Sequence, residues 1–153
     1  MIEVRVQAAD FDLGLELARL RAGDARIGAV VSFVGTVRDM NDGDAVAELE
    51  LEHYPGMTER EIAQHEAEAQ SRWPGIETNV IHRVGKLAPG ENIVLVVVAS
   101  AHRKAAFEAA EFLMDYLKTR APFWKLEQRL GTTEWVATRD SDRQAVSRWR
   151  RED

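Results

Sequence analysis

The stretch from Ser100 to Glu127 constrains the fold more than any other, because one long helical pattern carries cationic residues at both ends. Its apolar residues recur at helical spacing, and its charged stripe covers only about a quarter of the circumference. We therefore expect a helix that is buried on more than one side. Ser100 is the candidate N-cap, and Pro122 ends the helix because the residue before a proline avoids the α region.

The segments around this helix predict a sheet. The run 93–99 is continuously apolar, which is typical of a central strand covered on both faces. Other strands are expected at residues 2–6, 27–37, 45–53, 76–84, 123–129 and 134–138, the last two paired as a hairpin. Gly28 and Gly35 indicate a bulge or a close backbone approach within their strand.

Further helices are expected from their capping signals. Asp10 is a candidate N-cap for a helix carrying Leu13, Leu17 and Leu20, and Thr58 with Glu61 forms a capping box for a helix ending near Trp73. A short helix is expected after Ser141. Several neighbouring strands are joined by turns too short for parallel crossovers. The sequence thus predicts a single α+β domain over residues 1–153, with a mixed, largely antiparallel sheet, packed helices and a small additional β-hairpin subdomain.

Charge and composition narrow the function. With no cysteine, the chain has no thiolate nucleophile or thiolate metal site. A net charge of −6 argues against broad nucleic-acid binding. Residues 118–153 nevertheless hold nine Lys or Arg against six Asp or Glu, which fits either an anionic ligand or acidic partner, or a solvated basic tail. No apolar run approaches about 18 residues, and no leader is visible, so we expect a cytoplasmic protein.

Six polar residues at strand and helix ends are candidates for chemistry, and each also has a structural interpretation. Lys118 could bind an anion or simply complement the helix dipole, and Lys125 could act as a base or pair with Glu127. His102 and Arg103 lie at a strand-to-helix junction, where anions often bind, but His102 could also be a first-turn histidine bonded to the backbone. Arg38 and Arg139 each follow a strand and could be anion ligands or strand-end charges. The histidines have no spacing that makes a metal site, and no metal or cofactor is assigned.

Five segments, taken together, resemble the large, catalytic subunit of the molybdopterin synthase family. They span nearly the whole chain in the family's order: GAVVSFVGTVRD (28–39), LEHYPGM (51–57), IHRVGKLAPGE (81–91), SAHR (100–103) and MDYLKTRAPFWKLE (114–127). The resemblance implies an α/β-hammerhead-like fold. It also implies a sulfurtransferase that converts cyclic pyranopterin monophosphate to molybdopterin in molybdenum cofactor biosynthesis. The sulfur donor would be the C-terminal Gly-Gly thiocarboxylate of a small ubiquitin-like subunit, within a heterotetramer built on a homodimer of large subunits.

The resemblance also assigns roles to residues. Lys118 and Lys125 match the family's essential lysines, and Glu127 would orient Lys125. Arg38, His102 and Arg103 match the positions that bind the pterin phosphate, and Thr36 and Val37 would line the same pocket. Arg139 matches a further basic site residue, which either protomer of the dimer could supply. On this hypothesis the two ends of the long helix form two sides of one pocket.

Two other functions remain as alternatives. A non-catalytic scaffold subunit would hold an acidic partner tail without turnover. Another enzyme acting on a small phosphate ester would need the anion site but no protein partner.

Overall fold

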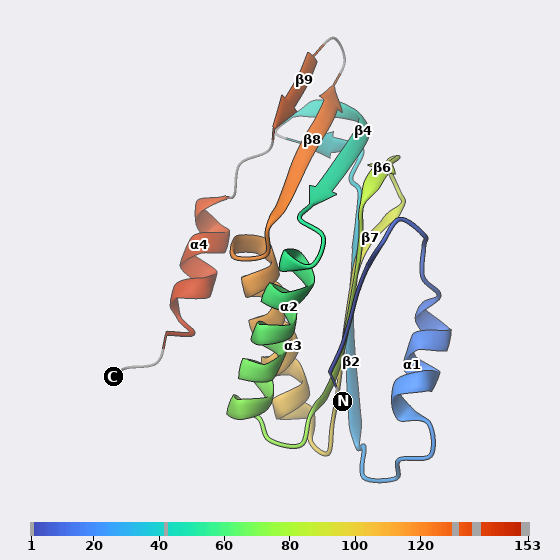
Figure 1. Ribbon diagram of the computed structural model, residues 1–153, viewed down its shortest axis with the longest axis vertical. Helices are drawn as coiled ribbons and strands as arrows, with labels where there is room; N and C mark the ends of the chain where they lie inside the picture. Colours follow the sequence, from blue (N-terminus) through green and yellow to red (C-terminus); the bar gives the residue numbers. More distant parts are fainter. Residues whose placement is uncertain (1, 42, 130–131, 136–138, 151–153) are drawn as a thin grey trace.

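The computed structural model describes residues 2–41, 43–129, 132–135 and 139–150, which form an α+β fold of two sheets and four helices (Figure 1). The predicted fold class is confirmed. In chain order the elements are β1 (Ile2–Gln7), α1 (Leu13–Arg21), β2 (Ala29–Thr36), β3 (Met40–Asn41), β4 (Asp44–His53), α2 (Met57–Arg72), β5 (Glu77–Arg83), β6 (Gly85–Leu87), β7 (Asn92–Ser100), α3 (Arg103–Thr119), β8 (Phe123–Arg129), β9 (Thr132–Trp135) and α4 (Asp140–Ser147).

The first sheet has the strand order β1-β5-β7-β2 and is covered on both faces. Strand β1 is parallel to β5, while β7 is antiparallel to both β5 and β2. Helix α1 lies against one face, and α2 and α3 lie against the other (Figure 1). Residues Val94 to Ser100 of β7 are buried, so the prediction of a doubly covered central strand is confirmed.

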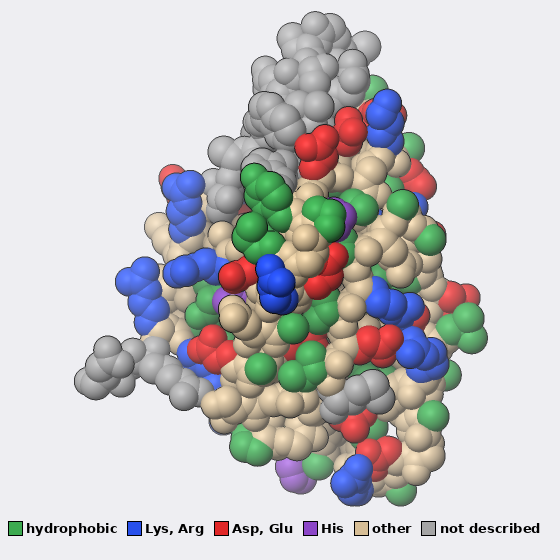
Figure 2. Space-filling model, in the orientation of Figure 1, with side chains coloured by type: hydrophobic (Ala, Val, Ile, Leu, Met, Phe, Trp, Pro, Cys, Tyr) green, Lys and Arg blue, Asp and Glu red, His purple; other side chains and the backbone are tan. Residues whose placement is uncertain are grey.

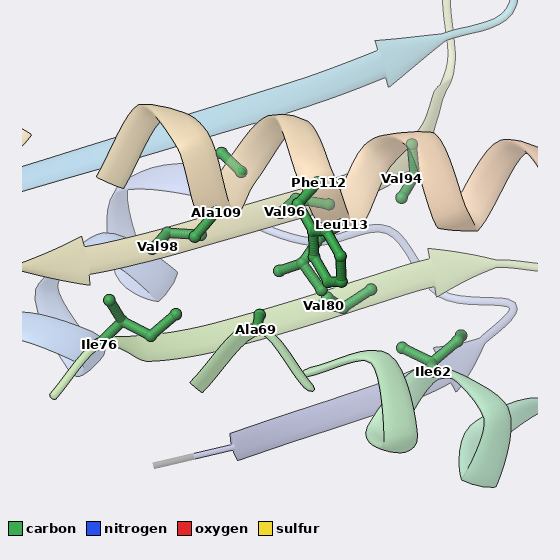
Figure 3. Close-up of a cluster of buried hydrophobic side chains, with 11 residues drawn as sticks. Ile62, Ala69, Ile76, Val80, Val94, Val96, Val98, Ala109, Phe112 and Leu113 are labelled. Carbon is green, nitrogen blue, oxygen red and sulfur yellow. The ribbon is translucent and has the colours of Figure 1, made fainter. Parts of the chain in front are cut away.

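The main core lies between this sheet and helices α2 and α3. Phe112 of α3 is fully buried, and it points between the strands and α2, beside Val80 and Val96 (Figure 3). A smaller core on the opposite face packs Leu20 of α1 against Leu95 and Val97 of β7. Because α3 contacts β2, β7, α2 and α4, it is buried on more than one side, as its narrow charged stripe predicted.

The predicted helix caps were wrong by two residues in four places. Asp12, not Asp10, caps α1 by accepting a hydrogen bond from the Leu15 backbone N–H at 3.0 Å. Helix α2 begins after Gly56, whose N–H donates to Glu59 at 2.5 Å, because the chain turns there with a φ of 84°. The two remaining cases are α3, whose N-cap is His102 and not Ser100, and α4, whose N-cap is Arg139 and not Ser141.

The second sheet lies at one end of the first (Figure 1, top) and has the order β3-β4-β8-β9, with β6 also paired to β4. The predicted hairpin is confirmed for β8 and β9, which are antiparallel. Residues 136–138, expected to extend the second hairpin strand, lie outside the described residues. Strand β6 was not predicted. None of the helices in the described part of the chain is long and apolar enough to cross a membrane.

Candidate active site

A cavity of about 420 Å³ opens where the two sheets meet the C-terminal end of α3. Its wall is assembled from segments far apart in the sequence: the end of β2, β4, β5, β7, the last turns of α3, the start of β8 and the start of α4. Five of the sequence-predicted site residues line it, namely Thr36, Val37, Arg38, Lys118 and Arg139. The tertiary structure therefore gathers most of the described candidates in one place.

The end of β2 is shaped so that Arg38 reaches the cavity. The register of β2 on β7 shifts between Gly35 and Thr36, which is the bulge that the glycine indicated. A Cβ at Gly35 would lie 2.8 Å from a methyl group of Val94, so the strand has no room for a side chain there. Beyond the bulge, the Val37 backbone N–H donates a hydrogen bond to the Glu91 carbonyl at 2.9 Å, and the Val37 carbonyl accepts one from the Gly90 N–H at 2.7 Å. This anchor leaves Arg38 exposed at the rim.

Lys118 enters the same cavity from the last turn of α3, with Met114 and Leu117 beside it. The dipole of α3 favours a cation at its C-terminal end, so the position of Lys118 also agrees with its interpretation as a partner of the helix dipole. Lys118 is exposed, and it lines the cavity together with Arg38.

Arg139 is placed in the cavity by the packing of α4 on α3. It is the N-cap residue of α4. The other end of α4 is tied down by Asp115 of α3, which accepts hydrogen bonds from the Trp149 indole at 2.5 Å and from Arg148 at 2.9 Å. Trp149 in turn meets Phe112 edge-on, with ring centroids 5.5 Å apart.

The cavity has an excess of positive charge. Arg38, Lys118 and Arg139 face a single acidic lining residue, Asp142, among the residues that the structure describes. In that same part of the chain, neither Arg38 nor Lys118 takes part in an ion pair. Acidic and basic side chains are interspersed on the face shown in Figure 2. A cluster of cations such as the one in the cavity can bind an anionic ligand and stabilise negative charge that develops during a reaction.

His102 and Arg103 are not part of this cavity lining. They lie at the start of α3, where the Ser100 hydroxyl accepts a hydrogen bond from the His102 backbone N–H at 3.3 Å. From Arg103 to Lys118 the helix rises about 22 Å, at about 1.5 Å per residue. One chain alone therefore does not bring the two ends of α3 to a common pocket. The close approach expected at Gly28 occurs here, because a Cβ would overlap the carbonyl oxygen of Ala101.

Lys125 and Glu127 lie on β8, and only their backbone belongs to the described structure. In the β4–β8 ladder Lys125 is opposite Leu51, and Glu127 is opposite Leu49. Both residues precede the hairpin turn and follow the Pro122–Phe123 bend that leads out of α3. The side chains of both residues lie outside the described part.

Two aromatic lining residues were not singled out from the sequence. His82 of β5 and Phe123 of β8 line the cavity and stack on each other, with ring centroids 3.8 Å apart and an interplanar angle of 19°. The Nδ1 atom of His82 lies 2.8 Å from the carbonyl oxygen of Arg83. Both belong to segments that carry the family resemblance, but no spacing in the sequence indicates that residues 41 positions apart touch. The residues described by the structure contain no group of three or more side chains suited to holding a metal ion.

Comparisons with known proteins agree on one family. A family model described as MoaE protein matches residues 6–120. The molybdopterin synthase catalytic subunit of Ralstonia nicotianae is 60% identical over 149 residues, which cover 97% of this chain and 85% of that protein. A solved MoaE protein of molybdopterin biosynthesis from Burkholderia ambifaria MC40-6 is 51% identical, with a TM-score of 0.84, over 97% of this chain and 98% of that one. The crystal structure of molybdopterin synthase from Staphylococcus aureus is 33% identical, with a TM-score of 0.79, over 88% of this chain and 96% of that one.

Proposed function

The chain belongs to the MoaE protein family, and we propose that it is a sulfurtransferase of molybdenum cofactor biosynthesis. It converts cyclic pyranopterin monophosphate to molybdopterin by adding two dithiolene sulfurs. The sulfur arrives as the C-terminal thiocarboxylate of a small ubiquitin-like subunit. The chain has no cysteine and therefore no sulfur nucleophile of its own, which agrees with a mechanism in which the partner subunit supplies the sulfur.

The observation that carries the proposal is that Arg38 and Lys118 line one cavity, although 80 positions separate them. Arg38 and Arg139 bind the substrate phosphate beside Thr36 and Val37. Lys118 stabilises the charge that develops as the thiocarboxylate reacts, a role worth roughly 2.7–4 kcal/mol for a single donor. Lys125 holds the substrate and assists proton transfer, and Glu127 orients Lys125.

His102 and Arg103 complete the phosphate site only when a second copy of the chain supplies them. The length of α3 separates them from Lys118 of their own chain. In the proposed homodimer, the α3 helix of the second copy would supply them. The assembly is a heterotetramer with two small subunits, in the cytoplasm, and residues 1–153 act as one domain within it.

The test is a reconstituted assay with the purified chain, the precursor and a thiocarboxylated small subunit, read by mass spectrometry of the pterin product. Lys118→Ala should fold normally and form dithiolene product at least about a hundredfold more slowly. Lys86→Ala on β6 removes an exposed lysine outside the cavity lining and serves as the matched control. Near-wild-type turnover of Lys118→Ala would remove Lys118 from the mechanism.

The same assay separates the two alternatives. Partner binding without product would identify a non-catalytic scaffold subunit. Conversion of the precursor without a sulfur-bearing partner would identify a different phosphate-ester enzyme.

A further inference from the structure

The contact between His82 and Phe123 joins the two sheets at the cavity. His82 belongs to β5 of the first sheet, where it is 7% exposed and pairs with Val94 of β7. Phe123 is the first residue of β8 in the second sheet. Their 3.8 Å centroid distance is the shortest ring separation described in the structure, and the two rings are nearly parallel.

Phe123 lies between the two lysines of the proposed mechanism along the chain. Lys118 lies in the last turn of α3, five residues before Phe123, and Lys125 follows Phe123 by two residues in β8. The backbone of Phe123 also pairs with His53 of β4, whose ring lies on Phe123 at a longer centroid distance of 6.5 Å. The first residue of β8 is therefore held from both sheets.

We propose that His82 is a positioning residue, which fixes the start of β8 through Phe123 and thereby sets the place of Lys125 relative to Lys118. This inference rests on the proposed function for its kinetic consequence. The structural part stands on the contact alone: without the His82 ring, one side of Phe123 loses its support, and the β8 segment can shift.

The arrangement of the imidazole favours positioning over proton transfer. One face of the ring is covered by Phe123, and Nδ1 lies against the backbone carbonyl of Arg83. A flat aromatic ring at position 82 should keep the stacking on Phe123, on which the positioning depends, but it loses the contact of Nδ1 with the Arg83 carbonyl. A leucine, which fills space but cannot stack, should not hold Phe123 in this way.

The experiment compares His82→Phe and His82→Leu in the reconstituted assay with the precursor and the thiocarboxylated small subunit. A displacement of about 1 Å in a catalytic group can reduce rate about a hundredfold. We expect His82→Leu to lower kcat by about tenfold or more, because Lys125 assists proton transfer, and to raise KM as well, because Lys125 also holds the substrate. His82→Phe should stay within about threefold of the wild type, with an unchanged pH profile of kcat.

Two further measurements test whether His82 acts through Phe123. In a Phe123→Leu background, His82→Leu should have no additional effect on kcat, since the contact is already lost. Backbone amide hydrogen exchange, which needs no substrate, should accelerate across β8 in His82→Leu and stay unchanged in β5 and β7.

His65→Leu is the matched control, because His65 also stacks on an aromatic ring, Tyr116 at 4.2 Å, but is not among the cavity-lining residues. It should change neither kcat nor exchange in β8.

The outcomes separate this inference from the proposed function. A wild-type chain that makes no dithiolene product would overturn the proposed function, while the exchange measurement would still decide the structural part. If the wild type is active and His82→Leu keeps its kcat, the inference is wrong. Equal losses in His82→Phe and His82→Leu would also overturn it, because the imidazole itself would then be required.

Discussion

The hydroxyl of Thr58 donates a hydrogen bond to the carbonyl oxygen of Pro122 at 3.0 Å, across 64 positions in the sequence. It also accepts one from the Tyr54 backbone N–H at 3.1 Å, and Thr58 is fully buried. The first turn of α2 is thereby tied to the bend between α3 and β8. That bend separates Lys118 from Lys125, so the bond belongs to the framework of the proposed site.

Replacing Thr58 by valine should destabilise the protein. The change keeps the side-chain shape but leaves the Pro122 carbonyl and the Tyr54 amide without their partner, which costs about 1–3 kcal/mol for a buried group. Urea unfolding followed by circular dichroism measures the change. Thr58→Ser retains the hydroxyl and is the control. If the two variants lose equal stability, the methyl group, and not the hydrogen bonds, is what matters.

Replacing Glu66 by glutamine should remove a pH dependence of stability. Burial raises the pKa of the Glu66 carboxyl from 4.5 to about 8, although the hydrogen bond from Thr78 opposes the shift. As pH rises from about 4.5 to 8, the unfolded chain releases this proton before the folded chain does. This group therefore lowers the free energy of unfolding over that window, by at most about 1.4 kcal/mol per pH unit.

The measurement is urea unfolding at a series of pH values, for the wild type and for Glu66→Gln. The difference in unfolding free energy between the two should grow with pH in favour of the variant. Glu61→Gln, on the same helix but partly exposed, is the matched control. A constant difference between wild type and Glu66→Gln from pH 5 to 8 would contradict the raised pKa.

Replacing Asp115 by alanine should weaken substrate binding through Arg139. Asp115 holds the Trp149 indole and Arg148, and so fixes α4 on α3. A loosened α4 moves its N-cap residue, Arg139, and we expect KM for the pterin substrate to rise several-fold with a smaller change in kcat. Glu111→Ala removes only an exposed ion pair with Arg148 and should leave KM unchanged. Equal KM values for Asp115→Ala and the wild type would show that α4 does not depend on this anchor.

Replacing Gly35 by alanine should disturb the end of β2. The added methyl group would lie 2.8 Å from Val94, so one of the two strands must move, at a cost of about 1–3 kcal/mol. Steady-state kinetics should also show a higher KM, because the bulge directs the chain toward Arg38. Val94→Ala in the same chain makes room for the methyl group. The double variant should therefore be more stable than the sum of the single changes predicts, and strict additivity would contradict the proposed overlap.

The local patterns of the sequence predicted most of the elements but misplaced their ends. Strand β7 and helix α3 were predictable because a continuous apolar run and a 3.6-residue period report burial directly. The first residues of the helices were not predictable in the same way. For α1, for example, Asp10 and Asp12 are equally good N-caps in the sequence. The choice between them depends on where the chain turns. Strand β6 was missed because three residues are too few to show a period.

The sequence by itself determined the chemistry that this protein has available: no thiol, a helix with cations at both ends, and the segments that identify its family. Only the tertiary structure decided which of those groups share a site. Arg38 and Lys118 line one cavity because the end of β2 and the C-terminal end of α3 lie at the same end of the first sheet. His102 and Arg103 do not join them within one chain, because a straight helix holds its two ends apart. His82 and Phe123 touch only because two sheets pack together, and no periodicity along a single element records such a contact.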